Sequence, residues 1–239
     1  MSTAIRATSK RAALPERQRP SNRGIVPPAS SAPSMSASNL VPPSIPNSPQ
    51  PAIATSEAPF TIWMTGLSGA GKSTVAGHLH GRFREQRRAS YVLDGDVLRN
   101  GLSSDLGFSR EDRHEQLRRV AHVARTLNEA GVIAIVALVS PYRADRALAR
   151  EIIGTEAMHE VWLSTPLHVC QARDPKGLYR LANAGQLPAM TGITAPYEPP
   201  LEEALHIDTT RHDAATCAKR ILDAIAVTRC TNEGILDVR

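Results

Sequence analysis

The chain has 239 residues and a formal net charge of +5, and 41% of its residues are hydrophobic. This length suits one α/β domain with an additional tail, and the hydrophobic share lies slightly below the globular norm, so part of the chain is expected not to fold. No apolar run approaches the roughly 18 residues of a membrane-spanning helix, which excludes an integral membrane protein of the helical kind.

The distribution of charge argues against a nucleic-acid-binding protein. Residues 1–60 contain six basic and two acidic residues, whereas the rest of the chain contains 22 basic and 21 acidic residues. The nearly neutral remainder offers no basic face for nucleic acid. Cys170, Cys217 and Cys230 are widely spaced and form no metal-binding pattern. We therefore expect a reduced, cytoplasmic protein without nucleic-acid or membrane partners.

Residues 1–58 are predicted to form a disordered tail. They are rich in Pro, Ser and Ala and have almost no aromatic or periodic apolar residues. Proline blocks helices and strand ladders, so this segment has little means of forming a core. The same stretch is rich in Arg and Ser and poor in acidic residues, as organellar transit peptides are, which makes an organelle the alternative location. We place the folded domain at residues 59–230.

From residue 60 onward, predicted strands and helices alternate. The expected strands cover residues 60–65, 89–93, 132–139, 160–164 and 204–208. The expected helices cover residues 75–85, 110–130, 144–153, 166–172 and 213–227. This alternation predicts an α/β fold, a doubly wound parallel sheet with helices on both faces, of the P-loop NTPase type. The connections 97–108 and 174–200 show no core periodicity, and we interpret the second, with its glycines and prolines, as a lid.

The strongest motif follows the first predicted strand and precedes a helix. It fits the pattern G-x-x-x-x-G-K-[ST], in which backbone N–H groups and a helix N-terminus surround phosphates. Lys72 is expected to reach the β- and γ-phosphates of ATP, and the Ser73 hydroxyl to bind Mg²⁺. The alternative is a glycine-rich turn without a ligand. The expected ATP-binding loop consists of Gly66, Leu67, Ser68, Gly69, Ala70, Gly71, Lys72, Ser73 and Thr74.

Two carboxylates, Asp94 and Asp96, follow the second predicted strand and flank Gly95. Ligands of parallel sheets bind outside the carboxyl ends of the strands. Phosphoryl transfer needs metal charge, a cation on the moving group and a carboxylate that orients the acceptor hydroxyl. Next to a P-loop, the pair is therefore predicted to supply metal support and a general base, although Asp-Gly-Asp alone is more typical of a solvated turn.

Four arginines lie between the second strand and the end of the next helix: Arg99, Arg113, Arg118 and Arg119. Their guanidinium groups could hold an anionic acceptor through paired hydrogen bonds. For Arg118 and Arg119 a solvated, charged helix face is the alternative.

The expected lid opens with residues 173–179. Arg173 and Lys176 are cations suited to phosphate, a glycine can act as a hinge, and Tyr179 adds an aromatic ring. A third polar cluster, residues 140–143, follows the strand predicted at 132–139 and begins with Ser140. We expect it at the same edge of the sheet as the P-loop.

Taken together, these stretches resemble the adenylylsulfate kinase (APS kinase) family. Its members use ATP to phosphorylate the ribose 3′-hydroxyl of adenosine 5′-phosphosulfate (APS), giving PAPS and ADP. A P-loop alone is shared by many families, whereas the whole set in this order is highly specific. The matching stretches cover residues 66–74, 93–96, 105–109, 118–120, 140–143, 173–179, 191–193 and 196–198.

The resemblance implies the substrates ATP and APS, Mg²⁺ as cofactor, and a role for each matched residue. Lys72 and Ser73 would serve the phosphates and the metal, Asp94 would support the metal, and Asp96 would accept the proton of the 3′-hydroxyl. Arg173 would contact ATP. The substrate side would comprise Arg99, Phe108, Arg113, Ser140, Lys176 and Tyr179. A homodimer and a functional link to ATP sulfurylase are compatible with the resemblance.

Ser140 matches a serine described in the family as a phosphoserine intermediate. In-line transfer, however, needs only positioning and charge. The physical argument therefore favours a Ser140 that hydrogen-bonds substrate, and both roles remain open at this point.

The chain departs from the family pattern at five positions. The family usually has Asn, Asn, Phe, Phe and Asp where this chain has Val97, Ser103, Leu138, Met190 and Thr194. We expect Val97 and Ser103 to remove polar groups from the substrate side and Leu138 and Met190 to remove aromatic surface near the lid. These departures keep one alternative open, a related P-loop kinase with another small acceptor. A nucleotide-binding protein without turnover is a further alternative, against which the intact Lys72, Ser73, Asp94 and Asp96 argue.

Overall fold

The structure is a computed structural model that describes residues 58–201 and 204–236. The predicted disordered tail therefore lies, except for residue 58, outside the described residues, and so does the side chain of Cys230. None of the helices within these ranges has the length and hydropathy to cross a bilayer.

Five parallel strands form one sheet in the order β2-β3-β1-β4-β5. Strand β1 is central, and its Met64 pairs with Ala137 of β3 on one side and Val161 of β4 on the other. The predicted doubly wound parallel sheet is thereby confirmed. The strands are β1 (Thr61–Thr65), β2 (Ser90–Asp94), β3 (Ile133–Ala137), β4 (Met158–Leu163) and β5 (Leu205–Ile207).

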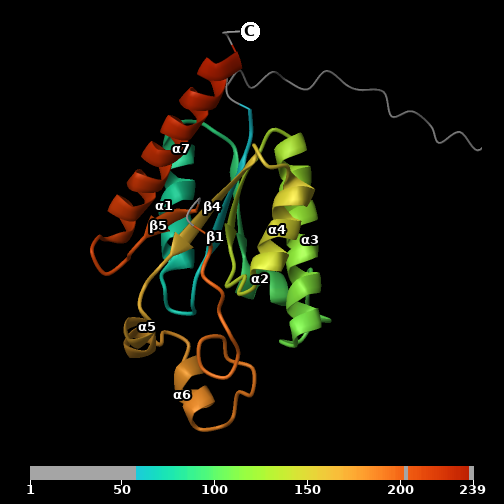
Figure 1. The fold of residues 1–239 in the computed structure, drawn as a ribbon, viewed down its shortest axis with the longest axis vertical. Helices are drawn as coiled ribbons and strands as arrows, with labels where there is room; N and C mark the ends of the chain where they lie inside the picture. Colours follow the sequence, from blue (N-terminus) through green and yellow to red (C-terminus); the bar gives the residue numbers. More distant parts are fainter. Residues whose placement is uncertain (1–57, 202–203, 237–239) are drawn as a thin grey trace, which may run out of the picture. The chain divides into compact units, whose positions relative to one another are not determined.

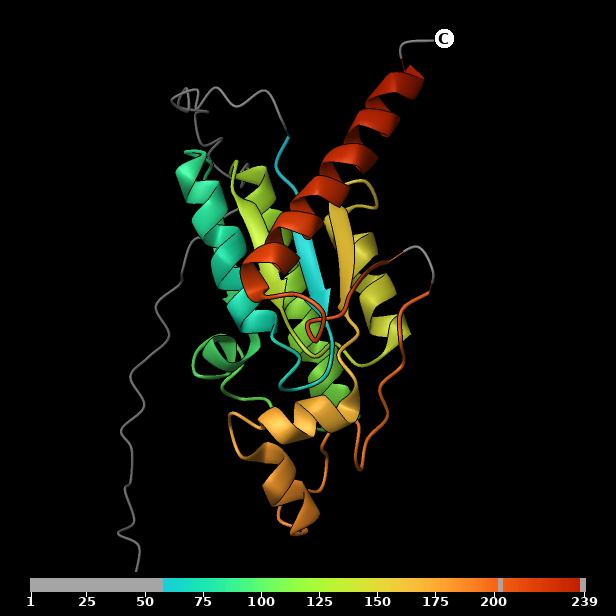
Figure 2. The same cartoon turned by 90° about the vertical axis from the view of Figure 1, so that its left-hand side faces the viewer.

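Helices cover both faces of this sheet, as Figures 1 and 2 show. One face packs against α1 (Lys72–Glu85) and α7 (Ala214–Leu236), and the other against α3 (Arg110–Glu129) and α4 (Arg143–Ile153). Because side chains alternate along a strand, Ile62 and Met64 of β1 enter the first core and Trp63 enters the second. Burial on both faces explains why the central strands are almost entirely apolar.

Two short helices correct the expectation of irregular connections. Helix α2 (Gly95–Arg99) begins where the Asp94 carboxylate accepts the Asp96 N–H at 3.0 Å. Helix α6 (Leu178–Asn183) begins where the Asp174 carboxylate accepts the N–H groups of residues 179 and 180, each at 3.1 Å. The prediction was wrong here because a capping carboxylate can start a helix of one or two turns, which is too short for apolar periodicity.

The strands all end at one edge of the sheet, at the lower end of Figure 1, together with α2, α5 (Leu167–Arg173) and α6. Helix α1 reaches this edge because it begins at Lys72, three residues earlier than expected, so that the end of the P-loop motif forms its first turn. Helix α3 begins as predicted, with the Ser109 hydroxyl accepting the Asp112 N–H at 3.0 Å. The fold thus gathers the predicted site residues at one edge.

Candidate active site

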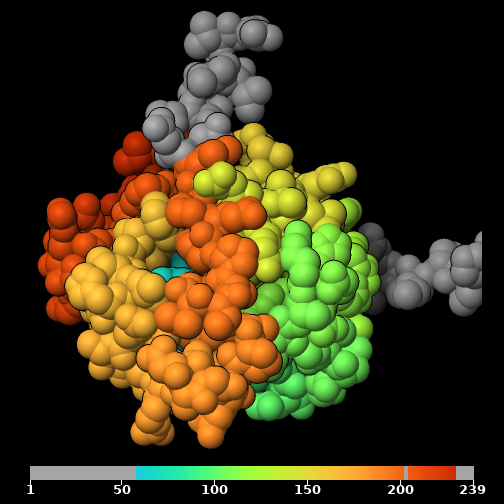
Figure 3. Space-filling model, turned by 60° about the horizontal axis from the view of Figure 1, so that its bottom comes forward, coloured from blue at the N-terminus to red at the C-terminus, as the bar shows by residue number. Residues whose placement is uncertain are grey.

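A cavity of about 790 Å³ opens at the carboxyl edge of the sheet. Its walls come from the P-loop, the ends of β2 and β3, helix α3, the segment 173–191 and the loop between β5 and α7. Figure 3 shows this end of the molecule, with atoms of the cyan part of the chain, which includes β1 and the P-loop, visible in an opening between the yellow-orange and orange parts. A cavity of this size accommodates ligands of nucleotide size.

The glycines of the P-loop allow a close approach of backbone to backbone. A Cβ atom on Gly66 would lie 2.7 Å from the Leu163 carbonyl oxygen, and one on Gly69 would lie 2.9 Å from that of Cys170. Both glycines have positive φ, so a side chain would be strained as well as crowded. The loop can therefore curl against β4 and α5 and turn its N–H groups and the start of α1 toward the cavity.

Lys72 lies within this curl. Its Nζ donates to the carbonyl oxygens of Gly66 at 2.8 Å and Leu67 at 2.7 Å. Burial, with a further contribution from the nearby Lys176 cation, lowers the pKa of Lys72 to about 8. An anionic phosphate at the loop would favour the charged ammonium and raise this pKa again.

We therefore expect ATP binding to take up a proton above pH 8. The free Lys72 is largely neutral at pH 8.5, where ATP has already lost its own titratable proton, and the phosphates re-protonate the amine. Calorimetric titration of ATP at pH 8.5, in buffers of different ionisation enthalpy, should show uptake of more than about half a proton. Lys72→Met should abolish this uptake, and an unchanged uptake in that variant would assign the proton to another group.

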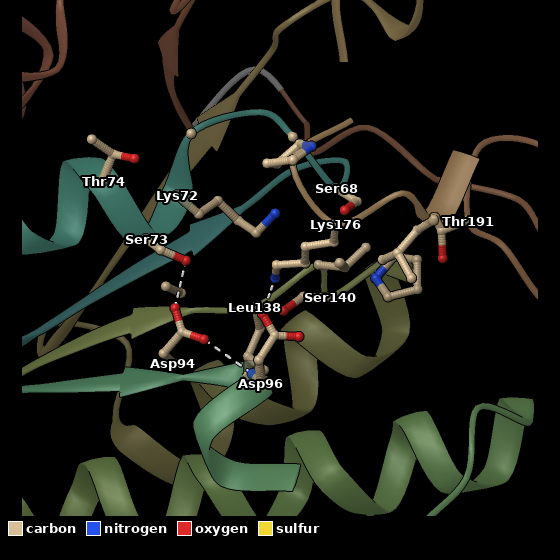
Figure 4. Close-up of a pocket in the computed structure, with 18 of the residues that line it drawn as sticks. Ser68, Lys72, Ser73, Thr74, Asp94, Asp96, Leu138, Ser140, Lys176 and Thr191 are labelled. Atoms are coloured by element: carbon tan, nitrogen blue, oxygen red, sulfur yellow. Dashed lines mark hydrogen bonds and ion pairs between the residues drawn. The ribbon is translucent and has the colours of Figure 1, made fainter. Parts of the chain in front are cut away.

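Asp94 and Asp96 lie at the end of β2, facing the P-loop (Figure 4). The Ser73 hydroxyl donates to Asp94 Oδ2 at 2.5 Å. A hydroxyl and a carboxylate are hard oxygen donors of the kind that Mg²⁺ prefers. Mg²⁺ is commonly held by one or two such side chains together with substrate phosphates.

Asp96 is exposed on the first turn of α2 and forms an ion pair with Lys176 from the far side of the cavity (Figure 4). Lys176 thereby joins the predicted lid to the end of β2. The predicted cation and the predicted base are thus brought together, within the electrostatic reach of Lys72.

Phe108 lines the cavity close to two guanidinium groups. Its ring centroid is 4.2 Å from the Arg99 guanidinium carbon and 5.5 Å from that of Arg113. Arg99 donates to the Gly107 carbonyl at 2.6 Å, and Arg113 to that of Ala189 at 2.9 Å. Within residues 58–201 and 204–229 neither arginine has a carboxylate ion-pair partner. This wall therefore combines an aromatic face with uncompensated positive charge, which suits an aromatic anion.

Arg118 and Arg119 do not join this wall. Arg118 pairs with Glu115 at 2.8 Å, and Arg119 pairs with both Glu115 at 2.8 Å and Asp105 at 2.7 Å. The two guanidinium groups hold the Glu115 pKa at about 2. The alternative interpretation, a charged surface of α3, is the one that the geometry supports.

Ser140 lines the cavity in a left-handed backbone conformation, with φ of 43°. Its hydroxyl accepts a hydrogen bond from the Trp63 indole at 3.1 Å, and its carbonyl accepts one from Arg146 at 2.7 Å. Arg146 is almost fully buried and also contacts Glu160 at 2.7 Å and the Glu198 carbonyl at 2.8 Å. This anchoring stabilises an unusual backbone conformation, which costs of the order of 1–3 kcal/mol.

Three residues expected on the substrate side lie elsewhere. Tyr179 is buried, and its hydroxyl donates to the Ser68 carbonyl at 2.9 Å, so it supports the P-loop from behind. Val97 is exposed at the surface and Ser103 is buried, and neither is among the residues that line the cavity. Leu138 and Met190, in contrast, do line it, as expected.

Several residues that line the cavity were given no site role from the sequence, among them Gln116, Thr191 and Thr209. Gln116 accepts a hydrogen bond from Arg99 through Oε1 and is nearly buried. It lies three positions after Arg113 on α3, and this spacing on one helix face could have indicated it. Thr191 and Thr209 lie in irregular segments, where no periodicity marks the residues that face a cavity.

The chain is similar in sequence to known adenylylsulfate kinases. The sequence model described as adenylylsulphate kinase matches residues 58–208. An adenylyl-sulfate kinase from Pseudomonas aeruginosa is 51% identical over 166 residues, which cover 70% of this chain and 85% of that protein.

Two solved structures extend the comparison. An APS kinase from Mycobacterium tuberculosis, in complex with AMPPNP and APS, is 43% identical with a TM-score of 0.67, and the match covers 70% of this chain and 96% of that one. A hexameric APS kinase from Thiobacillus denitrificans is 34% identical with a TM-score of 0.51, and the match covers 68% of this chain and 28% of that one.

Proposed function

The chain belongs to the adenylylsulfate kinase family, and from this premise we propose that it transfers the γ-phosphoryl group of ATP to the 3′-hydroxyl of APS, giving PAPS and ADP. One observation carries the proposal. A single cavity is lined by the P-loop, by an aromatic ring close to two arginines and by Asp96. A donor triphosphate and an anionic acceptor nucleotide can therefore meet at one carboxylate.

On the donor side, the P-loop N–H groups and Lys72 bind the β- and γ-phosphates. Ser73 and Asp94, already in contact, hold Mg²⁺, which supplies charge neutralisation on the phosphates when it is bound. Arg173 adds a cation at the mouth of the loop. Membership of the family implies a nucleotide as the phosphoryl donor. We propose Mg²⁺ as the metal because both protein ligands are hard oxygen donors.

On the acceptor side, Phe108 stacks on the adenine of APS, and Arg99 and Arg113 bind its phosphosulfate. Asp96 accepts the proton of the 3′-hydroxyl as transfer proceeds. Since Lys176 already pairs with Asp96, acceptor binding exchanges this ion pair for a hydrogen bond to the hydroxyl and leaves Lys176 free to contact the transferring phosphoryl group. The segment 174–200 then acts as a lid, because it supplies Lys176, Met190 and Thr191 to the cavity.

The test of this function is acceptor-dependent ADP release. Purified protein with ATP and Mg²⁺ should release ADP on addition of APS and far less with AMP, adenosine or small sugars. A second acceptor is also tested, because Leu138 and Met190 line the cavity at two positions where the family usually has Phe. Faster release with a non-sulfated alcohol would establish the related kinase as the better description. Release with no acceptor would point to hydrolysis.

Ser140→Ala should retain substantial activity. The hydroxyl accepts a hydrogen bond from buried Trp63 and is one contact among many, so we expect a loss of less than about tenfold in kcat/KM, the scale of one neutral hydrogen bond. Incubation with labelled ATP alone should leave the protein unlabelled. Stoichiometric phosphate on Ser140, passed to APS at the rate of turnover, would instead establish a phosphoserine intermediate.

Assembly, partnership and location stay predictions. We propose a homodimer, a functional link to ATP sulfurylase and a cytoplasmic location. Sedimentation of the purified protein tests the first, and co-purification with ATP sulfurylase tests the second.

A further inference from the structure

Thr209, in the loop between β5 and α7, connects three separate parts of the donor side. Its hydroxyl accepts a hydrogen bond from an Arg173 terminal nitrogen at 2.9 Å, donates to the Ala70 carbonyl at 3.0 Å and lies 2.8 Å from the Thr165 hydroxyl. Its carbonyl accepts a bond from the second terminal nitrogen of Arg173 at 3.1 Å. One residue thus contacts the P-loop, the residue that ends α5 and the segment after β4.

The hydrogen-bonding capacity of this hydroxyl is fully used. A threonine hydroxyl has one donor hydrogen and two acceptor lone pairs. The bonds to Ala70 and Arg173 and the contact with the Thr165 hydroxyl, in which either oxygen can donate, together account for all three. Thr165 is itself buried, so the junction is closed to water on that side. The position of the Thr209 hydroxyl is therefore determined by the elements that surround it.

Arg173 is oriented by these contacts without losing its charge. Both of its terminal nitrogens are held by Thr209, and one of them also donates to the Gly69 carbonyl of the P-loop at 3.2 Å. All of these acceptors are neutral oxygens. In the part of the chain that the structure describes, no carboxylate forms an ion pair with Arg173. The plane of the guanidinium is thus fixed at the mouth of the P-loop while its positive charge remains available to a ligand.

We propose that Thr209 is a positioning residue for the donor nucleotide and acts by holding the Arg173 guanidinium against the P-loop. The inference rests on the proposed function only in that ATP is taken as the P-loop ligand. Without the hydroxyl, Arg173 keeps its charge and its bonds to the Thr209 and Gly69 carbonyls but loses the bond to the side chain that helps to fix the plane of its guanidinium, and Ala70 loses the bond from Thr209. The acceptor side is built from other elements and is unaffected.

The test compares Thr209→Val, which keeps the shape but removes the hydroxyl, with Thr209→Ser, which restores it. Thr210→Val is the matched control, since Thr210 is exposed and its hydroxyl bonds to Asp208 at 2.7 Å. We expect Thr209→Val to weaken Mg²⁺–ATP binding, measured without acceptor, and to raise the KM for ATP about tenfold, the scale of hydrogen bonds to a charged group. The KM for APS and the affinity of Thr209→Ser and Thr210→Val should stay near wild type.

A double-mutant cycle tests whether Thr209 acts through Arg173. In an Arg173→Met background, Thr209→Val should weaken ATP binding by no more than about twofold, because the group it orients is gone. Arg173→Lys keeps the charge without the planar fork, so it should weaken ATP binding about as much as Thr209→Val. A full effect of Thr209→Val in the Arg173→Met background, or wild-type affinity of Arg173→Lys, would overturn the proposal. Because binding is measured without acceptor, absence of APS phosphorylation alone would count against the proposed function and leave this inference standing.

Discussion

Asp96→Asn should lower APS-dependent turnover by about a hundredfold or more while ATP binding stays near the wild-type affinity. A secondary hydroxyl is a poor nucleophile, and a carboxylate within hydrogen-bonding reach can take its proton as transfer proceeds, an effect typically worth 10²–10⁴ in rate. Asn keeps the size and the N-terminal position on α2 but cannot act as this base. Turnover is followed as ADP release with APS, and ATP affinity by titration without acceptor.

The matched control for this variant is Asp223→Asn. Asp223 is an exposed aspartate that pairs with a lysine, as Asp96 does, but its partner is Lys219 on α7, outside the cavity. Its replacement should leave turnover unchanged. If Asp96→Asn loses ATP binding instead, Asp96 supports the metal and its division of roles with Asp94 is reversed.

Lys72→Met should also lower turnover by at least about a hundredfold, the effect of removing one preorganised charge that acts on the transferring group. Methionine preserves the aliphatic stem but cannot neutralise phosphate charge. Because Lys72 donates to two carbonyl oxygens of the P-loop, the variant should also weaken ATP binding, in contrast to Asp96→Asn. Rapid-quench measurement of a single turnover separates the two effects.

Lys219→Met is the control, because it removes an exposed ammonium that pairs with Asp223 and does not line the cavity. It should bind ATP and turn over as the wild type does. Near-wild-type turnover of Lys72→Met would mean that the P-loop does not act on the phosphoryl group and would refute the assignment of the donor side.

The sheet and the donor side could be predicted from the sequence because their signals are local. Apolar strands, amphipathic helices and the contiguous residues 66–74 each carry their own pattern. The contact between Ser73 and Asp94 then follows from topology, since parallel strands end at one edge of the sheet.

The acceptor wall and the lid were harder to predict, because their contacts are set by tertiary packing. Charge alone could not separate Arg113, which faces the cavity, from Arg119, which pairs with Asp105 at 2.7 Å. The sequence predicts Tyr179 as a substrate contact, but its side chain is buried and its hydroxyl donates to the Ser68 carbonyl. Nothing in the sequence marks Thr209, whose partners lie far along the chain, or Arg146, which contacts Ser140, Glu160 and Glu198 from three separate segments.

The most direct test of the central claim follows the γ-phosphoryl group itself. Wild-type protein is incubated with Mg²⁺, APS and ATP labelled at the γ-phosphorus, and the labelled product is identified. We predict that the label appears on the 3′-oxygen of APS, as PAPS, in a one-to-one ratio with ADP. Label recovered as inorganic phosphate, or on another acceptor in preference to APS, would contradict the account.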